Sequence, residues 1–143
     1  MLTERLGDVG KKIHTSRSRN DQVLTAMQLL LKDEITEIKE LTRALFSTWM
    51  SLAEKHKNDL LPGYTHLQVA MPSSFGLWFS AYAESLVDDV ILLNAAHTIC
   101  DQNPLGSAAG YGSSFPIDRM HTTEALQFST LKFNAVAAQM GRG

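Results

Sequence analysis

The chain has 143 residues, of which 44% are hydrophobic, and its 13 basic and 15 acidic side chains give a formal net charge of −2. This composition supports one folded core, excludes a disordered or fibrous chain, and excludes a general affinity for nucleic acid backbones. The single cysteine, Cys100, excludes an internal disulfide. Because no apolar run reaches the roughly 18 residues that span a bilayer and no secretory segment is visible, we expect a cytoplasmic protein.

The first long helix is predicted for residues 21–57, where neither glycine nor proline interrupts the chain. Apolar residues recur there in steps of three or four, and 28 residues divided by eight steps give a spacing of about 3.5, the period of a left-handed packing seam. The seam consists of Leu24, Met27, Leu31, Ile35, Ile38, Leu41, Leu45, Trp49 and Leu52. Further apolar residues beside the seam predict that this helix lies inside a bundle.

A second helix is predicted for residues 72–100, packed nearly antiparallel to the first. Pro72 suits a first helical turn, and Ser73 or Ser74 can cap it. Between the two helices, Pro62 and Gly63 predict a turn with no regular structure around it.

The rest of the chain is predicted to contain one long loop and one short helix. Residues 101–115 are rich in Gly, Ser and Asn, which favours an irregular loop. The short helix is predicted for residues 116–127, with Ser114 as its cap and Asp118 in its first turn. No alternating pattern predicts a sheet, and no element is predicted after Phe133. The predicted fold class is therefore all-α.

An unusually polar cluster, HTSRSRND at residues 14–21, directly precedes the first long helix. Asn20 or Asp21 is available as the N-cap of that helix. Arg17, Arg19 and the free amides at the helix start can together hold a carboxylate or a phosphate. The alternative is a capped helix start whose arginines are solvated or pair with acidic neighbours. The cluster alone leaves both interpretations open.

A second polar motif, LPGYTHLQ at residues 61–68, contains Thr65 and His66. A loop histidine beside a hydroxyl suits general acid–base chemistry because its ordinary pKa lies near neutral pH. The alternative is a turn histidine that is bonded to a backbone carbonyl. The other four histidines fit a structural role better, and no spacing of His, Asp and Glu is typical of a metal site.

The third motif is NPLGSAAGYGSSFPIDR at residues 103–119, whose glycines suit either a ligand-covering loop or a surface connection. No GKS or GKT follows it, so it is not a P-loop. The order HTSRSRNDQV, LPGYTHLQ, NPLGSAAG resembles the central region of the argininosuccinate lyase family, within the fumarase and aspartase superfamily. The resemblance runs from GDVGKKIHT to the last residue, and Ser16 departs from a glycine that is common in the family.

The resemblance implies the long-helix bundle of that superfamily and a reversible β-elimination of argininosuccinate to arginine and fumarate, without metal or organic cofactor. It implies that Asn20 is a substrate-binding amide and that Ser18 and Arg19 contact or order the succinyl carboxylates. Thr65 would be a substrate-binding hydroxyl, and His66 the catalytic histidine. A sister lyase acting on adenylosuccinate or another fumarate adduct, and a non-catalytic helical assembly module like the lens crystallins of this fold, are the alternatives.

The resemblance also implies a homotetramer whose active sites are each assembled from three subunits, with a small dicarboxylate substrate and neither nucleic acid nor membrane as partner. The family's general base, a serine in a GSSxMPxKxN loop, has no counterpart here. The stretch Gly112–Ser114 imitates only the first residues of that loop and lies elsewhere in the chain. We therefore expect residues 1–143 to be the central helical region of a lyase subunit, less than a third of it, and inactive alone.

Overall fold

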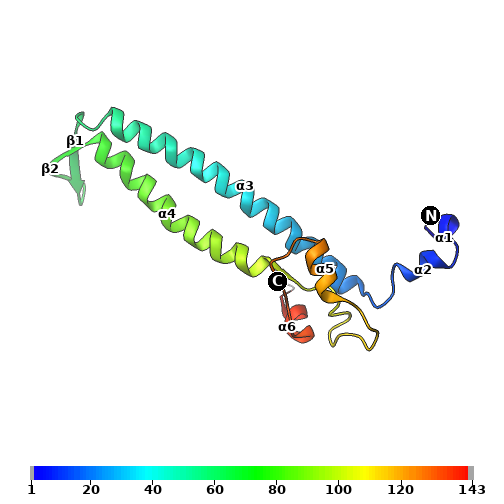
Figure 1. Cartoon of the computed structure of the whole chain (residues 1–143). Helices are drawn as coiled ribbons and strands as arrows, with labels where there is room; N and C mark the ends of the chain where they lie inside the picture. Colours follow the sequence, from blue (N-terminus) through cyan, green and yellow to red (C-terminus); the bar gives the residue numbers. More distant parts are fainter. Residues whose placement is uncertain (1, 142–143) are drawn as a thin grey trace. The chain divides into compact units, whose positions relative to one another are not determined.

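The computed structural model describes residues 2–141, and most of them are helical (Figure 1). Two compact units are present: one contains the residues up to Lys32 and those from Thr98 onward, and the other contains Asp33–His97. The predicted helical fold with two long helices is confirmed. In chain order the elements are α1 (Leu2–Leu6), α2 (Val9–Lys12), α3 (Arg19–Lys55), β1 (Leu60–Thr65), β2 (Gln68–Ser74), α4 (Phe75–Cys100), β3 (Gln102–Asn103), α5 (Arg119–Ala125), β4 (Thr130–Leu131) and α6 (Ala135–Met140).

Helix α3 begins and ends two residues earlier than the predicted range of 21–57. Its cap is Ser18, whose Oγ accepts the backbone N–H of Asn20 at 3.2 Å. Asp21 lies inside the first turn, and its Oδ1 accepts the backbone N–H of Ser18 at 2.9 Å. Together these two bonds make Ser18 the cap of α3, so the prediction that Asn20 or Asp21 caps the helix was wrong.

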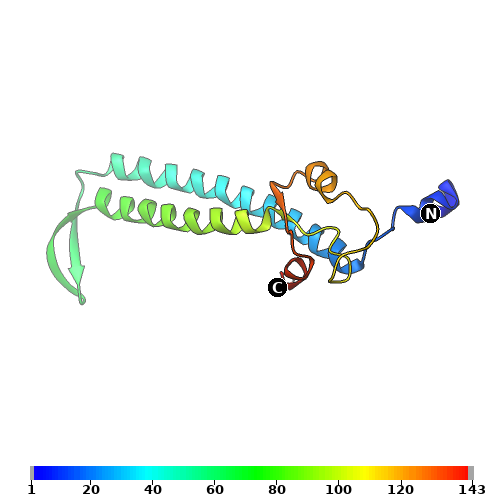
Figure 2. The same cartoon turned by 60° about the horizontal axis from the view of Figure 1, so that its bottom comes forward.

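In the second unit, residues 33–55 of α3 lie antiparallel to residues 75–97 of α4, as predicted (Figures 1 and 2). Trp49 stacks on Phe79 and on Tyr82, with ring centroids 5.6 and 5.5 Å apart. Trp78 meets Tyr82 edge-on at 5.1 Å. Each such aromatic pair contributes about 0.5–1.5 kcal/mol beyond the burial of its surface. The Trp49 contacts therefore hold α3 and α4 together, whereas the pair of Trp78 and Tyr82 lies within α4.

The first turn of α4 approaches the end of α3 closely at Gly76. A Cβ at this position would lie 2.6 Å from the Cα of Lys57 and 2.7 Å from the backbone oxygen of Ala53. Gly76 also donates its N–H to the backbone oxygen of His56 at 3.1 Å. The absence of a side chain at Gly76 is therefore what allows the two backbones to meet.

A β-hairpin connects α3 and α4, where no regular structure was predicted. Strands β1 and β2 pair antiparallel, with Pro62 opposite Pro72 and an irregularity after Gly63. Prolines are tolerated because each strand of a two-stranded sheet has an unpaired edge. The chain reverses at His66 and Leu67, so the predicted turn at Pro62 and Gly63 was wrong.

Helix α4 begins three residues after its predicted start. Pro72 lies in β2 and not in a helical turn. Ser74, one of the two predicted caps, accepts the backbone N–H of Leu77 at 3.1 Å through its Oγ. The hairpin extends the strand pairing up to Ser74, and this pairing delays the helix start.

The first unit contains a short parallel pair, β3 with β4, which was also not predicted. Asn103 of β3 is fully buried, and its Nδ2 donates to the hydroxyls of Thr122 and Thr123 at 3.2 and 2.9 Å. The cap of α5 is Asp118, whose Oδ1 accepts the N–H of His121 at 2.8 Å; the predicted cap, Ser114, was wrong. Helix α6 occupies the segment for which no element was predicted.

A salt bridge between Lys32 of α3 and Asp101 also stabilises the first unit. The charged atoms are 2.5 Å apart, and only 14% and 13% of the two side chains are exposed. Ser129 donates both its backbone N–H and its hydroxyl to Asp101. Burial acts most strongly and by itself raises the pKa of Asp101, but the hydrogen bonds from Lys32 and Ser129, with the charge of Lys32, together lower the pKa below its ordinary value.

Large apolar side chains remain exposed on both long helices of the second unit. Leu41 and Leu45 of the predicted seam are 64% and 45% exposed, and Leu92 of α4 is 71% exposed. No helix within residues 2–141 is both long enough and apolar enough to cross a membrane. Apolar surface of this kind usually marks a protein interface.

We predict that Gly76→Ala lowers the free energy of unfolding by about 1–3 kcal/mol, because the crowding atoms belong to backbone that cannot rotate away. The measurement is thermal unfolding. Gly141→Ala is the matched control, because its added Cβ would meet only the Ala138 oxygen at 3.7 Å, an ordinary contact. Equal melting temperatures for the two variants would contradict the close approach at Gly76.

We predict that the stabilisation by Asp101 depends on pH. Its folded pKa lies below the unfolded value of about 3.9, so the stabilisation is fully present above that value and is lost as pH falls through the folded pKa. The difference in melting temperature between the wild type and Asp101→Asn should therefore be constant from neutral pH to about pH 5 and shrink below pH 4. A difference in melting temperature that grows on acidification would contradict the lowered pKa of Asp101.

Candidate functional site

The polar residues predicted to bind a substrate carboxylate, Ser18, Arg19 and Asn20, lie together in the first unit. They form the cap and the first turn of α3. Arg19 is exposed, whereas Ser18 and Asn20 are half-buried. The start of a helix presents N–H groups and the positive end of the helix dipole, so this turn is suited to an anion.

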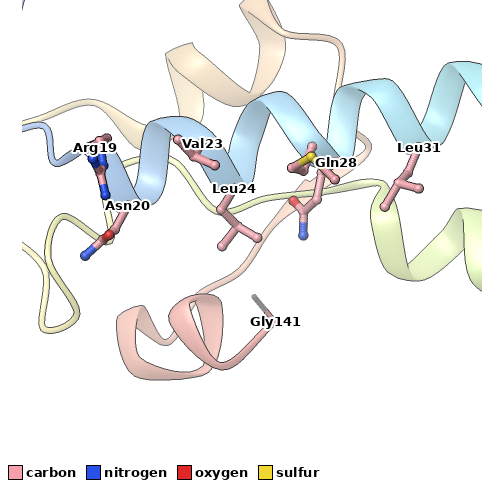
Figure 3. Close-up of a pocket in the computed structure, with 8 residues that line it drawn as sticks. Arg19, Asn20, Val23, Leu24, Gln28, Leu31 and Gly141 are labelled. Carbon is pink, nitrogen blue, oxygen red and sulfur yellow. The ribbon is translucent and has the colours of Figure 1, made fainter. Parts of the chain in front are cut away.

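Arg19 and Asn20 line one end of a cavity of about 570 Å³ along α3. Figure 3 shows that Asn20, Leu24 and Gln28, spaced by four residues, point to the same side of the helix as Gly141. Gln28 is 8% exposed, and its buried Oε1 accepts no hydrogen bond. The cavity is therefore polar at the helix start and mostly apolar further along, with one buried amide in its wall.

Asp21, which the sequence suggested as a cap or as an ion-pair partner of the neighbouring arginines, connects the first turn of α3 to the glycine-rich loop of residues 103–119. Its side chain has no exposed surface. Besides the N–H of Ser18, it accepts the N–H groups of Gly106 and Ala108 through Oδ2, at 3.2 and 3.0 Å. The pattern S-x-x-D before an apolar run is the signal that predicts the local part of this arrangement.

The glycine-rich loop is held from its other side by Arg119. The guanidinium donates to the backbone oxygens of Leu105, Lys132 and Phe133 at 3.0, 2.7 and 3.3 Å. Burial lowers the pKa of Arg119, and the charge of Asp21 opposes this shift. Gly106 has a φ of +91°, and a Cβ there would lie 2.8 Å from Arg119 Cγ, so both conformation and space require glycine.

Ser107, in the same loop, is fully buried, and its Oγ accepts a hydrogen bond from Gln139 of α6 at 2.8 Å. Ser113 Oγ accepts the backbone N–H of Phe115 at 3.2 Å and thus closes a local turn. The Ser107 hydroxyl therefore joins the loop to α6, and the Ser113 hydroxyl stabilises a turn within the loop. Neither is paired with a histidine as an activated nucleophile would be.

Thr65 and His66 lie at the tip of the hairpin in the second unit. His66 and Leu67 are the two turn residues, with φ angles of +49° and +64°, between the paired residues Thr65 and Gln68. A turn with two positive φ angles normally contains Asn and Gly. The left-handed conformation costs a residue such as His or Leu on the order of 1 kcal/mol, which marks this tip as a candidate functional position.

The predicted site residues therefore form two local groups, one at the start of α3 and one at the hairpin tip, which belong to different units. Of the other histidines, His56 lies 2.6 Å from the Asp59 carboxylate and His14 lies 3.4 Å from the Gln22 amide. Within residues 2–141, no group of three or more His, Cys, Asp or Glu side chains is arranged to hold a metal ion.

Comparison with known proteins identifies close relatives. Residues 1–140 match a protein family described as Lyase. Over all 143 residues the chain is 64% identical to "Argininosuccinate lyase" of Parabacteroides distasonis, and it spans 32% of that protein's length. Among solved structures, EDDS lyase in complex with formate has a TM-score of 0.93 and 26% identity over 97% of this chain and 28% of its own. An EDDS lyase variant with bound fumarate gives 0.92, with the same identity and coverage.

These findings confirm the family resemblance and the helical fold of a partial subunit that the three motifs predicted. The polar first turn of α3, the strained hairpin tip and the glycine-rich loop all lie within the matched residues. The chain belongs to the lyase family.

Proposed function

We propose that the native polypeptide containing this chain is an argininosuccinate lyase, which splits argininosuccinate reversibly into arginine and fumarate. The observation that supports this most strongly is the 64% identity over the whole chain to a protein of that name. Because the chain spans about a third of that relative, 32% of its length, we assign it the role of the central helical region of the subunit. We also propose that the protein is cytoplasmic.

The first step of the proposed reaction removes a proton from the carbon beside a succinyl carboxylate. The electron pair left behind is delocalised into that carboxylate, which becomes a dianion, before the C–N bond breaks and its electrons leave with the protonated nitrogen. In our proposal the Asn20 amide, together with Ser18 and Arg19, binds this carboxylate. Donors held in place by the cap of α3 need no reorganisation as charge develops, and one such donor is worth about 10²–10³ in rate in comparable sites.

At the hairpin tip, Thr65 supplies a substrate-binding hydroxyl and His66 takes part in proton transfer. The positive φ of His66 supports this role, because strain at an exposed turn persists where function selects the residue. His66 is exposed in this chain, as catalysis by a site shared between subunits would require.

We propose further that the native protein is a homotetramer with shared sites and that residues 1–143 alone are inactive. The exposed apolar side chains of α3 and α4 support association, because a stable soluble protein rarely leaves so much apolar surface in water. In our proposal, the base that removes the substrate proton is not among these residues.

A sister lyase acting on another fumarate adduct is the second candidate. The high structural similarity to EDDS lyase favours it, whereas the sequence identity to that enzyme, 26%, is far below the 64% shared with the argininosuccinate lyase relative. A non-catalytic helical assembly module is the third.

We predict that the native polypeptide releases fumarate from argininosuccinate and that residues 1–143 alone do not. The measurement is the ultraviolet absorbance of fumarate. Argininosuccinate, adenylosuccinate and EDDS are each tested as the substrate in separate assays. Turnover of only EDDS or adenylosuccinate would favour the sister lyase, and no turnover of any substrate would favour the assembly module. Turnover by residues 1–143 alone would show that the chain contains its own base.

We predict that His66→Asn in the native polypeptide lowers kcat for argininosuccinate by at least about 10²-fold. The free energy of unfolding should stay the same or rise by up to about 1 kcal/mol. Asparagine tolerates the left-handed conformation but cannot exchange a proton near neutral pH. Leu67→Asn is the matched control, since Leu67 shares the conformation and is 97% exposed. The control should keep its turnover, and similar activity losses in both variants would contradict a specific role for His66.

A further inference from the structure

The carboxylate of Asp21 has the geometry of a group that determines where its neighbours lie. Both of its oxygens are used: Oδ1 accepts the N–H of Ser18, and Oδ2 accepts the N–H groups of Gly106 and Ala108. These partners come from segments more than 80 residues apart, with separations of 85 and 87 residues for the loop bonds. One side chain thus holds the cap of α3 and the glycine-rich loop at a fixed distance.

The loop depends on this carboxylate. Gly106 and Ala108 have φ angles of +91° and +54°, and a left-handed alanine is unfavourable without compensating bonds. Arg119 and Gln139 bond to the loop at the Leu105 oxygen, the Ser107 hydroxyl and the Ala108 oxygen, none of which is a backbone N–H. The backbone N–H groups of Gly106 and Ala108 are bonded to Asp21 instead.

The cap depends on the same carboxylate. Ser18 donates its N–H to Asp21 and accepts the N–H of Asn20 through Oγ. A change at Asp21 is thereby transmitted to the backbone of Ser18 and to the orientation of its hydroxyl. Asp21 itself is fully buried and cannot contact a ligand in solution.

We propose that Asp21 is a positioning residue for the proposed reaction: it holds Ser18 and Asn20 in the geometry that binds the succinyl carboxylate by tying their turn to the Gly106–Ala108 backbone. The inference rests on the proposed function. It adds a residue that acts through others and never touches the substrate.

Asparagine at this position is the decisive substitution. It has nearly the same shape, but its one oxygen can accept bonds on only one side. If the oxygen faces the loop, the amide NH₂ opposes the N–H of Ser18, and if it faces Ser18, the NH₂ opposes two loop N–H groups. Either orientation breaks one of the two connections without removing volume.

The experiment compares Asp21→Asn with Asp101→Asn in the native polypeptide at its natural length. Asp101 is a matched control because it is a poorly exposed, multiply bonded carboxylate in the same unit, and its partners are Lys32 and Ser129 rather than the cap. The readouts are kcat/KM for argininosuccinate and the Kd for fumarate by calorimetry, both well below the melting temperature of each variant. Should D21N fail to fold, D21E keeps both oxygens but displaces them by one methylene and is measured in the same way.

We expect kcat/KM to fall by about 10–100-fold in D21N and the Kd for fumarate to rise, because small displacements of binding groups have effects of this size. D101N should stay within about twofold of the wild type in both readouts. Unchanged values in D21N, or equal losses in both variants, would overturn the positioning role alone. A wild type that neither binds nor releases fumarate overturns the proposed function, and the inference with it.

Discussion

A buried carboxylate at the start of α3 is the constraint on which the first unit depends. Moving an unpaired carboxylate out of water costs several kcal/mol, and the N–H donors of Ser18, Gly106 and Ala108 offset this cost for Asp21. The donors come from the helix cap and from the glycine-rich loop, and neither is complete without the other. Arg119 strengthens the arrangement electrostatically and binds the carbonyls on the far side of the loop.

The candidate residues at the hairpin tip differ from the buried Asp21, because they are exposed and their turn has an unfavourable backbone conformation. Thirteen residues in β1 and β2 support a two-residue turn in which neither residue is glycine or asparagine. The pairing of Thr65 with Gln68 forces His66 and Leu67 into the left-handed region. The strands therefore provide the stability that the turn itself lacks, and they present a histidine in a defined orientation.

The two long helices of the second unit meet through aromatic rings and small residues. Trp49, Phe79 and Tyr82 fill the contact in one region, and Gly76 allows the backbones to approach at the hairpin end. This interface uses only part of the apolar surface, because Leu41 and Leu92 remain largely exposed. The amount of unpaired apolar surface fits a subunit piece whose remaining partners lie in other chains or segments, as the proposed tetramer requires.

Local sequence patterns determined the helices, because helical periodicity depends on residues three and four positions apart. The 3.5-residue seam, with the absence of Gly and Pro from residues 21–57, predicted α3 to within two residues at each end, and the motif order identified the family. The hairpin was missed because Pro62 and Pro72 read locally as breakers, whereas in the structure they lie opposite each other on paired strands. The candidate residues at 18–20 and 65–66 were evident from sequence, but the bonds from Asp21 to residues 85 and 87 positions away were not. Only the tertiary structure decided that role, since a buried charge is defined by the donors that folding brings to it.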